Sequence, residues 1–164
     1  MSDLINAALP IIIGFLLVWF TYLNINYFYT IFKLKKSEKE MELCNTKLGI
    51  VVNYVALAVY IAGTIASLAL LVNSLLCGTF VSNGTFYLNI LALLAIFANQ
   101  YFSRVIYLSK KSLIIGRIKF DYRKIKRIDI HPTKMSFNYG QNHLATRLLF
   151  VDDEKLRVTL KRNA

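Results

Sequence analysis

Charged residues are confined to two parts of this chain, and the long stretch between them has none. All twenty lysines and arginines lie in residues 33–47 and 104–162. Residues 48–103 contain no charged side chain of either sign, and residues 1–32 contain only Asp3. Uncharged stretches of this length are typical of membrane-spanning segments, because a charged side chain is costly inside a bilayer.

The apolar residues form three blocks. They make up 56% of the chain while charged residues make up 18%, against about 45–50% and about 25% in soluble domains. The blocks are residues 4–32, 48–76 and 86–107. A bilayer core about 30 Å thick needs about 20 helical residues, so we predict three transmembrane helices within residues 1–107. The first block lacks the basic start of a signal peptide, so we interpret it as a retained span.

The basic residues predict the orientation of these spans. The loop at 33–47 has five lysines against three glutamates, and the chain from Arg104 onward carries 15 − 5 = +10 charges. The connection at 73–85 is uncharged. Because short loops rich in lysine and arginine stay in the cytoplasm, we expect the N-terminus outside and the C-terminus in the cytoplasm. Within the first loop, residues 38–42 could extend a helix or form a solvated loop.

Small residues recur at helical spacing in the second span. They are Ala58, Ala62, Gly63, Ala66 and Ser67. Small residues spaced in this way let helix backbones approach closely in lipid, so we expect this part of the span to pack against another helix. The sequence leaves open whether that helix belongs to the same chain or to a second copy in a homo-oligomer.

Residues 108–164 are predicted to form a small cytoplasmic β module, because here the apolar pattern changes to alternation. The alternating runs are residues 116–120, 127–131, 147–150 and 156–161. Alternation of this kind predicts an antiparallel sheet of roughly five strands with one dry and one wet face. Residues 152–154 are interpreted as the turn before the last strand. The predicted fold class is therefore a membrane α-helical protein of three transmembrane helices plus a small antiparallel β module.

The wet face of the predicted sheet is basic. Its members are Arg117, Lys119, Arg127, Arg147, Arg157 and Lys161. A lysine or arginine near an anionic leaflet contributes about 1 kcal/mol of attraction, so this face is a candidate surface for anionic lipid headgroups or an acidic partner. The alternative is a solvated face whose charge only reflects the membrane orientation. We expect no nucleic-acid partner, because no stacking-aromatic pattern accompanies the charge.

The chain lacks the residue patterns of enzymes, metal sites and ion pumps. An ion transporter usually needs an ionisable group deep in the membrane, and the second and third spans have none before Arg104. His131 and His143 are the only histidines, and Cys44 and Cys77 lie on opposite sides of the predicted membrane. No metal-ligand spacing, nucleophile elbow or Walker A motif is present. We therefore predict no catalytic residue, no cofactor and no metal.

One segment resembles a known family. Residues 113–130, LIIGRIKFDYRKIKRIDI, resemble the opening of bacterial pleckstrin-homology-like (PH-like) modules, in which a strand, a turn, an aromatic-x-x-Ile-x-x-Ile step and a next strand recur below transmembrane helices. Tyr122, Ile125 and Ile128 occupy that step. The resemblance covers residues 108–160 and implies a small barrel. The predicted strands leave no room for the closing helix that such modules normally have.

The resemblance also implies a function. Small bacterial membrane proteins with this type of tail include ones similar to bacteriocin self-immunity proteins, so a first hypothesis is self-protection against a membrane-active or membrane-delivered toxin, in the bacterial inner membrane. A second hypothesis is an accessory or scaffold subunit of a membrane transport or secretion complex, with the basic sheet binding a protein or anionic lipid. A third, an enzyme acting on lipid, would require a catalytic set that we do not find.

Overall fold

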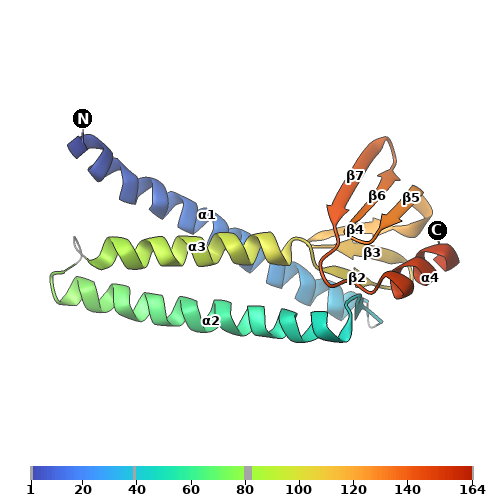
Figure 1. Ribbon diagram of the computed structural model, residues 1–164, viewed down its shortest axis with the longest axis horizontal. Coiled ribbons are helices and arrows are strands. Elements are labelled where there is room, and N and C mark those ends of the chain that lie inside the picture. The colour runs from blue at the N-terminus through green and yellow to red at the C-terminus, as the bar shows by residue number, and fades with distance from the viewer. Residues whose placement is uncertain (1, 39, 80–82, 164) are drawn as a thin grey trace. The chain divides into compact units, whose positions relative to one another are not determined.

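Four α-helices and two antiparallel sheets make up the described part of the chain (Figure 1). The computed structural model describes residues 2–38, 40–79 and 83–163. The three long helices are α1 (Ser2–Ser37), α2 (Lys47–Leu76) and α3 (Thr85–Phe102). Each is long and apolar enough to cross a membrane. The predicted order of three long apolar helices followed by a small antiparallel β module is confirmed.

The third helix is shorter than predicted. α3 ends at Phe102, whereas the apolar block suggested an end at residue 107. The residues beyond it form strand β2 (Ile106–Leu108), in which Ile106 and Leu108 are buried. A buried strand and a transmembrane helix both appear in a sequence as a run of apolar residues. Hydropathy therefore does not separate the end of α3 from β2, and the predicted span included part of the strand.

The chain divides into two compact units, and each unit joins distant parts of the sequence. The helical unit contains Met1–Asn26 and Tyr54–Gln100, and the mixed unit contains Tyr27–Asn53 and Tyr101–Ala164. The mixed unit therefore includes the connection between α1 and α2 as well as the C-terminal strands. The sequence had predicted a β module of residues 108–164 alone.

The first sheet of the mixed unit has four strands in the order β1-β2-β3-β4. The strands that join β2 in it are β1 (Glu42–Leu43), β3 (Ser112–Ile115) and β4 (Ile118–Asp121). β1 comes from the α1–α2 connection and pairs with β2. Next to it, the Cys44 amide donates to the Ile106 carbonyl at 2.9 Å, and Cys44 is fully buried. The connection is therefore part of the β module rather than a solvated loop.

The second sheet has three strands in the order β5-β6-β7. They are β5 (Ile125–His131), β6 (Lys134–Tyr139) and β7 (Asn142–Arg147). A short 3-10 helix, η2 (Tyr122–Lys124), joins β4 to β5. Tyr122 and Ile125 are buried, and Ile128 packs against the core. The aromatic-x-x-Ile-x-x-Ile step thus supplies core residues.

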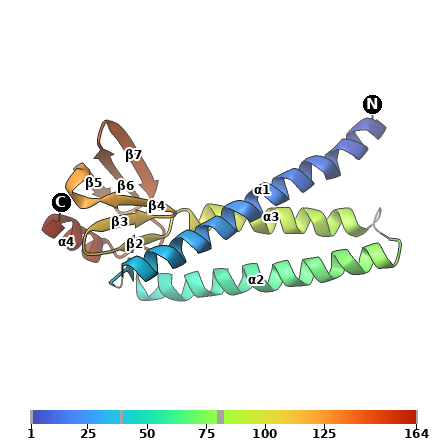
Figure 2. The same ribbon diagram turned by 180° about the vertical axis from the view of Figure 1, so that it is seen from behind.

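The last element is a helix, α4 (Asp153–Asn163), and the prediction of a strand over residues 156–161 is wrong. Leu156 and Leu160 are one helical turn apart and buried, whereas Val158 is 65% exposed. Apolar residues at i, i+2 and i+4 fit a strand by alternation, but the first and third also share a helix face. α4 follows the last strand, at a position where the sequence predicted no helix. Figures 1 and 2 show α4 beside β2 and β3.

Helix α4 begins where the sequence suggested a turn. The Lys155 amide donates to Asp152 Oδ1 at 3.0 Å, which caps the first turn of the helix. Asp153 and Glu154 stand in the first turn, and Lys161 and Arg162 in the last. This arrangement of charges stabilises a helix, because it complements the helix dipole.

The core of the mixed unit draws on both sheets, the α1–α2 connection and α4. Its buried members are Cys44, Ile106, Leu108, Leu113, Phe120, Tyr122, Ile125, Met135, Phe137, Leu148, Leu156 and Leu160. Phe120 and Phe137 pack edge to face across the two sheets, with ring centroids 5.2 Å apart. One core therefore fixes the geometry of the surfaces described next.

Candidate functional site

Glu38, directly after α1, is bound by residues from the C-terminal segment. Its side chain is 13% exposed and forms an ion pair with Lys119. The Ser112 hydroxyl donates to its two carboxylate oxygens at 3.2 and 3.0 Å. Burial alone would raise the pKa of Glu38, but hydrogen bonds from Lys119, Ser109 and Ser112 together outweigh it and lower the pKa. Glu38 therefore ties the end of α1 to strands β3 and β4.

Two more glutamates of the same connection bind lysines. Glu40 pairs with Lys110, and Glu42 accepts from Lys155 Nζ at 2.6 Å. The hydrogen bond between Glu42 and Lys155 lowers the pKa of Glu42 and raises the pKa of Lys155. Exposed pairs of this kind contribute only about 0–1 kcal/mol to stability. Their main effect is on charge: the connection neutralises lysines around the four-stranded sheet.

The six basic residues predicted to share one sheet face are spread over two sheets and a helix. Arg117 lies between β3 and β4, Lys119 on β4, Arg127 on β5, Arg147 at the end of β7, and Arg157 and Lys161 on α4. All six are exposed. The structure corrects the assignment of Arg157 and Lys161 to a strand, because both belong to α4. The Arg157 guanidinium donates to the Ile130 carbonyl.

The outward face of the β5-β6-β7 sheet gathers a different set of cations. Lys134 on β6 lies opposite His131 on β5 and Arg147 on β7. Residues directly opposite each other on antiparallel strands point to the same side of a sheet. Met135, the next residue along β6, is fully buried, so Lys134 and its two partners point outward.

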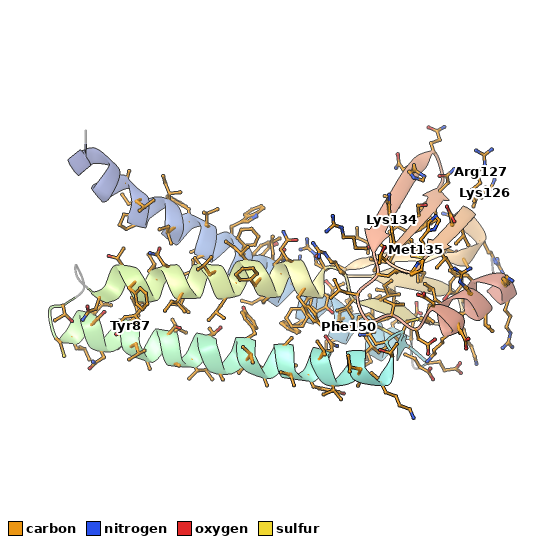
Figure 3. All side chains as sticks on the ribbon, in the orientation of Figure 1. Tyr87, Lys126, Arg127, Lys134, Met135 and Phe150 are labelled. Carbon is orange, nitrogen blue, oxygen red and sulfur yellow. The ribbon has the colours of Figure 1, made fainter. Side chains whose placement is uncertain are left out.

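The other end of this face is formed by the start of β5. Lys126 lies opposite Asn138, which is four residues from Lys134 along β6. The cations at the two ends are therefore separated by about 13 Å along the strand direction. Figure 3 shows Lys126 and Arg127 next to each other, away from Lys134.

A β-bulge places Arg127 beside Lys126. Between the pairs Lys126–Asn138 and Asp129–Ser136, β5 has two residues where β6 has one. Arg127 takes a φ of 52° there and stays exposed. A left-handed conformation costs a non-glycine residue about 1 kcal/mol. The bulge thus holds two adjacent cations at one end of the sheet.

We call Lys126, Arg127, Lys134 and Arg147 the cationic sheet face. In the part of the chain that the structure describes, none of them has an acidic side chain at ion-pair distance. Asp129, the acidic residue on this face, is hydrogen-bonded to His131 Nε2 at 3.1 Å. Between the cations the surface carries Ser136 and Ala145, which are small, and Asp129 lies opposite Ser136.

The sequence predicts a place on a basic sheet face for Arg127 and Arg147 but not for Lys126 and Lys134. The two lysines share this face only because β6 lies between β5 and β7, and β6 is not among the strands predicted from the sequence. Its signal was the alternation of Met135, Phe137 and Tyr139 with polar residues, followed by Gly140 in the turn. Once β6 is placed between β5 and β7, the register brings the missed lysines onto the same face.

The small residues of α2 split into two groups. A Cβ at Gly63 would lie 3.0 Å from Leu94 Cδ1 of α3, and Ser67 is buried. Ala58, Ala62 and Ala66 are exposed. Close helix packing within the described chain therefore involves Gly63 and not the alanines.

A buried amide links the three long helices of the helical unit. Asn24 of α1 is 1% exposed, and its Nδ2 donates to the Ala95 carbonyl of α3 at 3.0 Å. The same Nδ2 donates to the Tyr60 hydroxyl of α2 at 3.2 Å. Hydrogen bonds between helices in lipid give modest stabilisation, and this one fixes α1 against its neighbours.

The described residues contain no cluster of three or more His, Cys, Asp or Glu side chains that could hold a metal ion. A pocket of 510 Å³ lies beside the Glu42–Lys155 pair, with Thr159 and Arg162 in its lining. Its charged groups include those already paired in the ion pairs above.

The comparisons with known proteins give no family: no protein-family model matches the chain, and no curated protein or solved structure matches it significantly.

Proposed function

We propose that this chain is a non-enzymatic, multi-pass protein of the bacterial inner membrane whose cytoplasmic β module docks an acidic segment of another protein. This is the role of an accessory or scaffold subunit of a membrane complex. The proposal places the N-terminus outside and the module inside, because all twenty lysines and arginines belong to the mixed unit.

The observation that carries the proposal is that, among the described residues, some cations of the module form ion pairs with glutamates whereas those of the cationic sheet face do not. The α1–α2 connection pairs its glutamates with Lys110, Lys119 and Lys155. The cationic sheet face has no such partner in the described residues. Cations that have no acidic partner within the chain can pair with an anionic ligand.

The spacing of the cations favours an extended acidic peptide. A ligand that reaches both ends of the face must span about 13 Å, which is about four residues of extended chain. Acidic side chains at its ends would form charge-assisted hydrogen bonds with Lys126 and Arg127 at one end and Lys134 and Arg147 at the other. The small side chains of Ser136 and Ala145 between them leave room for the peptide backbone.

Binding of a fluorescent oligoglutamate peptide tests this proposal. The full chain is placed in phosphatidylcholine nanodiscs, and peptide anisotropy is measured. We expect the double variant Lys134→Gln/Arg147→Gln to bind at least about tenfold more weakly, since the loss of even one charge-assisted contact costs about 1.5 kcal/mol. The matched control Lys110→Gln/Lys155→Gln removes the same charge from the paired side and should bind like the wild type.

Two results would contradict the proposal. Equal weakening by both double variants would mean that the peptide responds only to net charge. Absence of peptide binding, with binding to phosphatidylglycerol-containing vesicles instead, would replace a protein partner with anionic lipid. Circular dichroism of each variant verifies that the module remains folded.

Self-protection against a toxin is our second proposal, and α4 favours it. PH-like modules normally close with a helix, and α4 is a helix that follows the last strand. Expression in a strain sensitive to membrane-active bacteriocins should then raise survival above that of cells with an empty vector. Unchanged killing by every toxin in such a panel would rule this role out for those toxins and leave the docking role.

A further inference from the structure

Two apolar residues between β7 and α4 are exposed. Leu149 is 36% exposed and Phe150 is 43% exposed. Phe150 takes a φ of 54°, a left-handed conformation that bulky side chains rarely adopt. Leu148, two residues earlier, is buried in the core. The backbone therefore turns sharply here and presents the Leu149–Phe150 tip outward.

The Leu149–Phe150 tip is fixed to the start of α2. The Phe150 carbonyl accepts from the Thr46 amide at 2.9 Å and from the Thr46 hydroxyl at 3.3 Å. A Cβ on Gly49 would lie 2.5 Å from that carbonyl oxygen, so only glycine allows this approach. Figure 3 shows Phe150 beside the first turn of α2. The contact is made within the mixed unit.

The length and composition of α2 suit a helix whose first turn lies at a membrane interface. α2 has 30 residues, or about 45 Å of helix. A bilayer with its headgroup regions is about 40–45 Å thick, so both ends of α2 reach the headgroups. The uncharged part of the helix starts at Leu48, directly after Lys47. A side chain held against Gly49 is therefore held at the depth where acyl chains meet headgroups.

We propose that the Leu149–Phe150 tip inserts into the interface of the leaflet that α2 enters and anchors the β module to the bilayer. The partner is a lipid surface. The exposed cation Lys47 is next in the chain to Thr46, which binds the tip, and it suits headgroup phosphates while the apolar tip suits the acyl boundary. This anchor does not depend on what the cationic sheet face binds.

Tryptophan fluorescence tests the anchor. Trp19 is the only tryptophan of the chain, so Trp19→Phe gives a silent background. Phe150→Trp reports on the tip, and Val158→Trp on α4 is the matched control, because Val158 is also exposed and apolar. In vesicles of phosphatidylcholine brominated near the headgroup end of the acyl chain, we expect at least twofold stronger quenching at residue 150 than at residue 158, together with a blue-shifted emission.

Equal quenching at the two positions, or water-like emission at residue 150, would overturn the proposal. The unmodified chain gives a second measurement that needs no substitution. A membrane-partitioned diazirine probe should label Leu149 or Phe150 in addition to the three long helices, and should not label residues 156–160. Labelling confined to the helices would also overturn the anchor.

Discussion

Glu38 is the least exposed of the three glutamates of the α1–α2 connection. Its carboxylate is largely buried and bound by Lys119 and Ser112, whereas the Glu40–Lys110 pair is exposed on both sides. A buried acceptor that loses its charge leaves its donors poorly satisfied, while an exposed pair is replaced by water. The three glutamates of the connection therefore contribute unequally to the stability of the module, although the sequence does not distinguish them.

Glu38→Gln should destabilise the module by about 1.5–3 kcal/mol, the range for hydrogen bonds to a charged group. Glu40→Gln removes the same charge from an exposed pair and should cost less than about 1 kcal/mol. Chemical unfolding of the full chain in detergent, followed by near-ultraviolet circular dichroism, measures both. Equal effects would show that the burial of Glu38 has no energetic consequence.

The contribution of Glu38 should depend on pH. Its pKa is lower in the folded chain than the ordinary value of 4.5, so the unfolded chain binds the proton more readily. The stabilisation is then complete above the ordinary pKa and is lost as pH falls through the lower folded value. The stability difference between wild type and Glu38→Gln should shrink as pH falls from 7 to below 4.5. A difference that stays constant over this range would contradict the assignment.

Among the elements, those set by local pattern could be predicted and those set by distant pairing could not. The long helices follow from length and absence of charge, and β4 and β5 follow from alternation. β1 has two residues, and it is a strand only because it pairs with β2, far along the chain. No local pattern marks such a strand, and for the same reason the acidic partners of Lys110 and Lys155 could not be predicted.

Helix α4 was missed although it has a local signal. Its apolar residues fit both a strand and a helix face. The deciding features were the acidic start and the basic end of the segment, with Asp152 as N-cap. Capping and charge at the ends should therefore be weighed against alternation when a segment has only three apolar positions.

Asp152→Ala should destabilise the module by about 1 kcal/mol, because it removes the N-cap of α4. Asp152→Asn keeps a side-chain oxygen that can accept from the Lys155 amide and should stay within about 0.5 kcal/mol of wild type. The same unfolding measurement compares them. If alanine and asparagine behave alike, the cap does not hold the start of the helix.

At the scale of the whole molecule, the reactivity of the two cysteine thiols tests the fold and the membrane orientation. Cys44 tests the core of the module, and Cys77 tests which side of the membrane the end of α2 faces. Cys44 is fully buried, and burial raises the pKa of its thiol to about 12. Cys77, after the end of α2, is exposed. Thiol reagents attack the thiolate, so Cys44 should be inert in the folded protein and Cys77 reactive wherever the reagent can reach it.

A membrane-impermeant maleimide should therefore label Cys77 in intact bacteria, and Cys77→Ser should abolish this labelling. Cys44 should react only after lysis and denaturation. Protection of Cys77 until lysis would reverse the proposed orientation. Reaction of Cys44 in a native lysate would contradict its place in the module core.

The central claim is that the glutamates of the α1–α2 connection decide which cations of the module are open to a partner. Removing Glu40 and Glu42 tests it most directly, because their exposed pairs contribute little to stability. Glu40→Gln/Glu42→Gln should bind oligoglutamate about threefold to tenfold more tightly than wild type, as one freed charged contact contributes about 1 kcal/mol. Adding Lys110→Gln/Lys155→Gln should return binding to the wild-type value. Unchanged binding in Glu40→Gln/Glu42→Gln, with the module folded, would contradict the account.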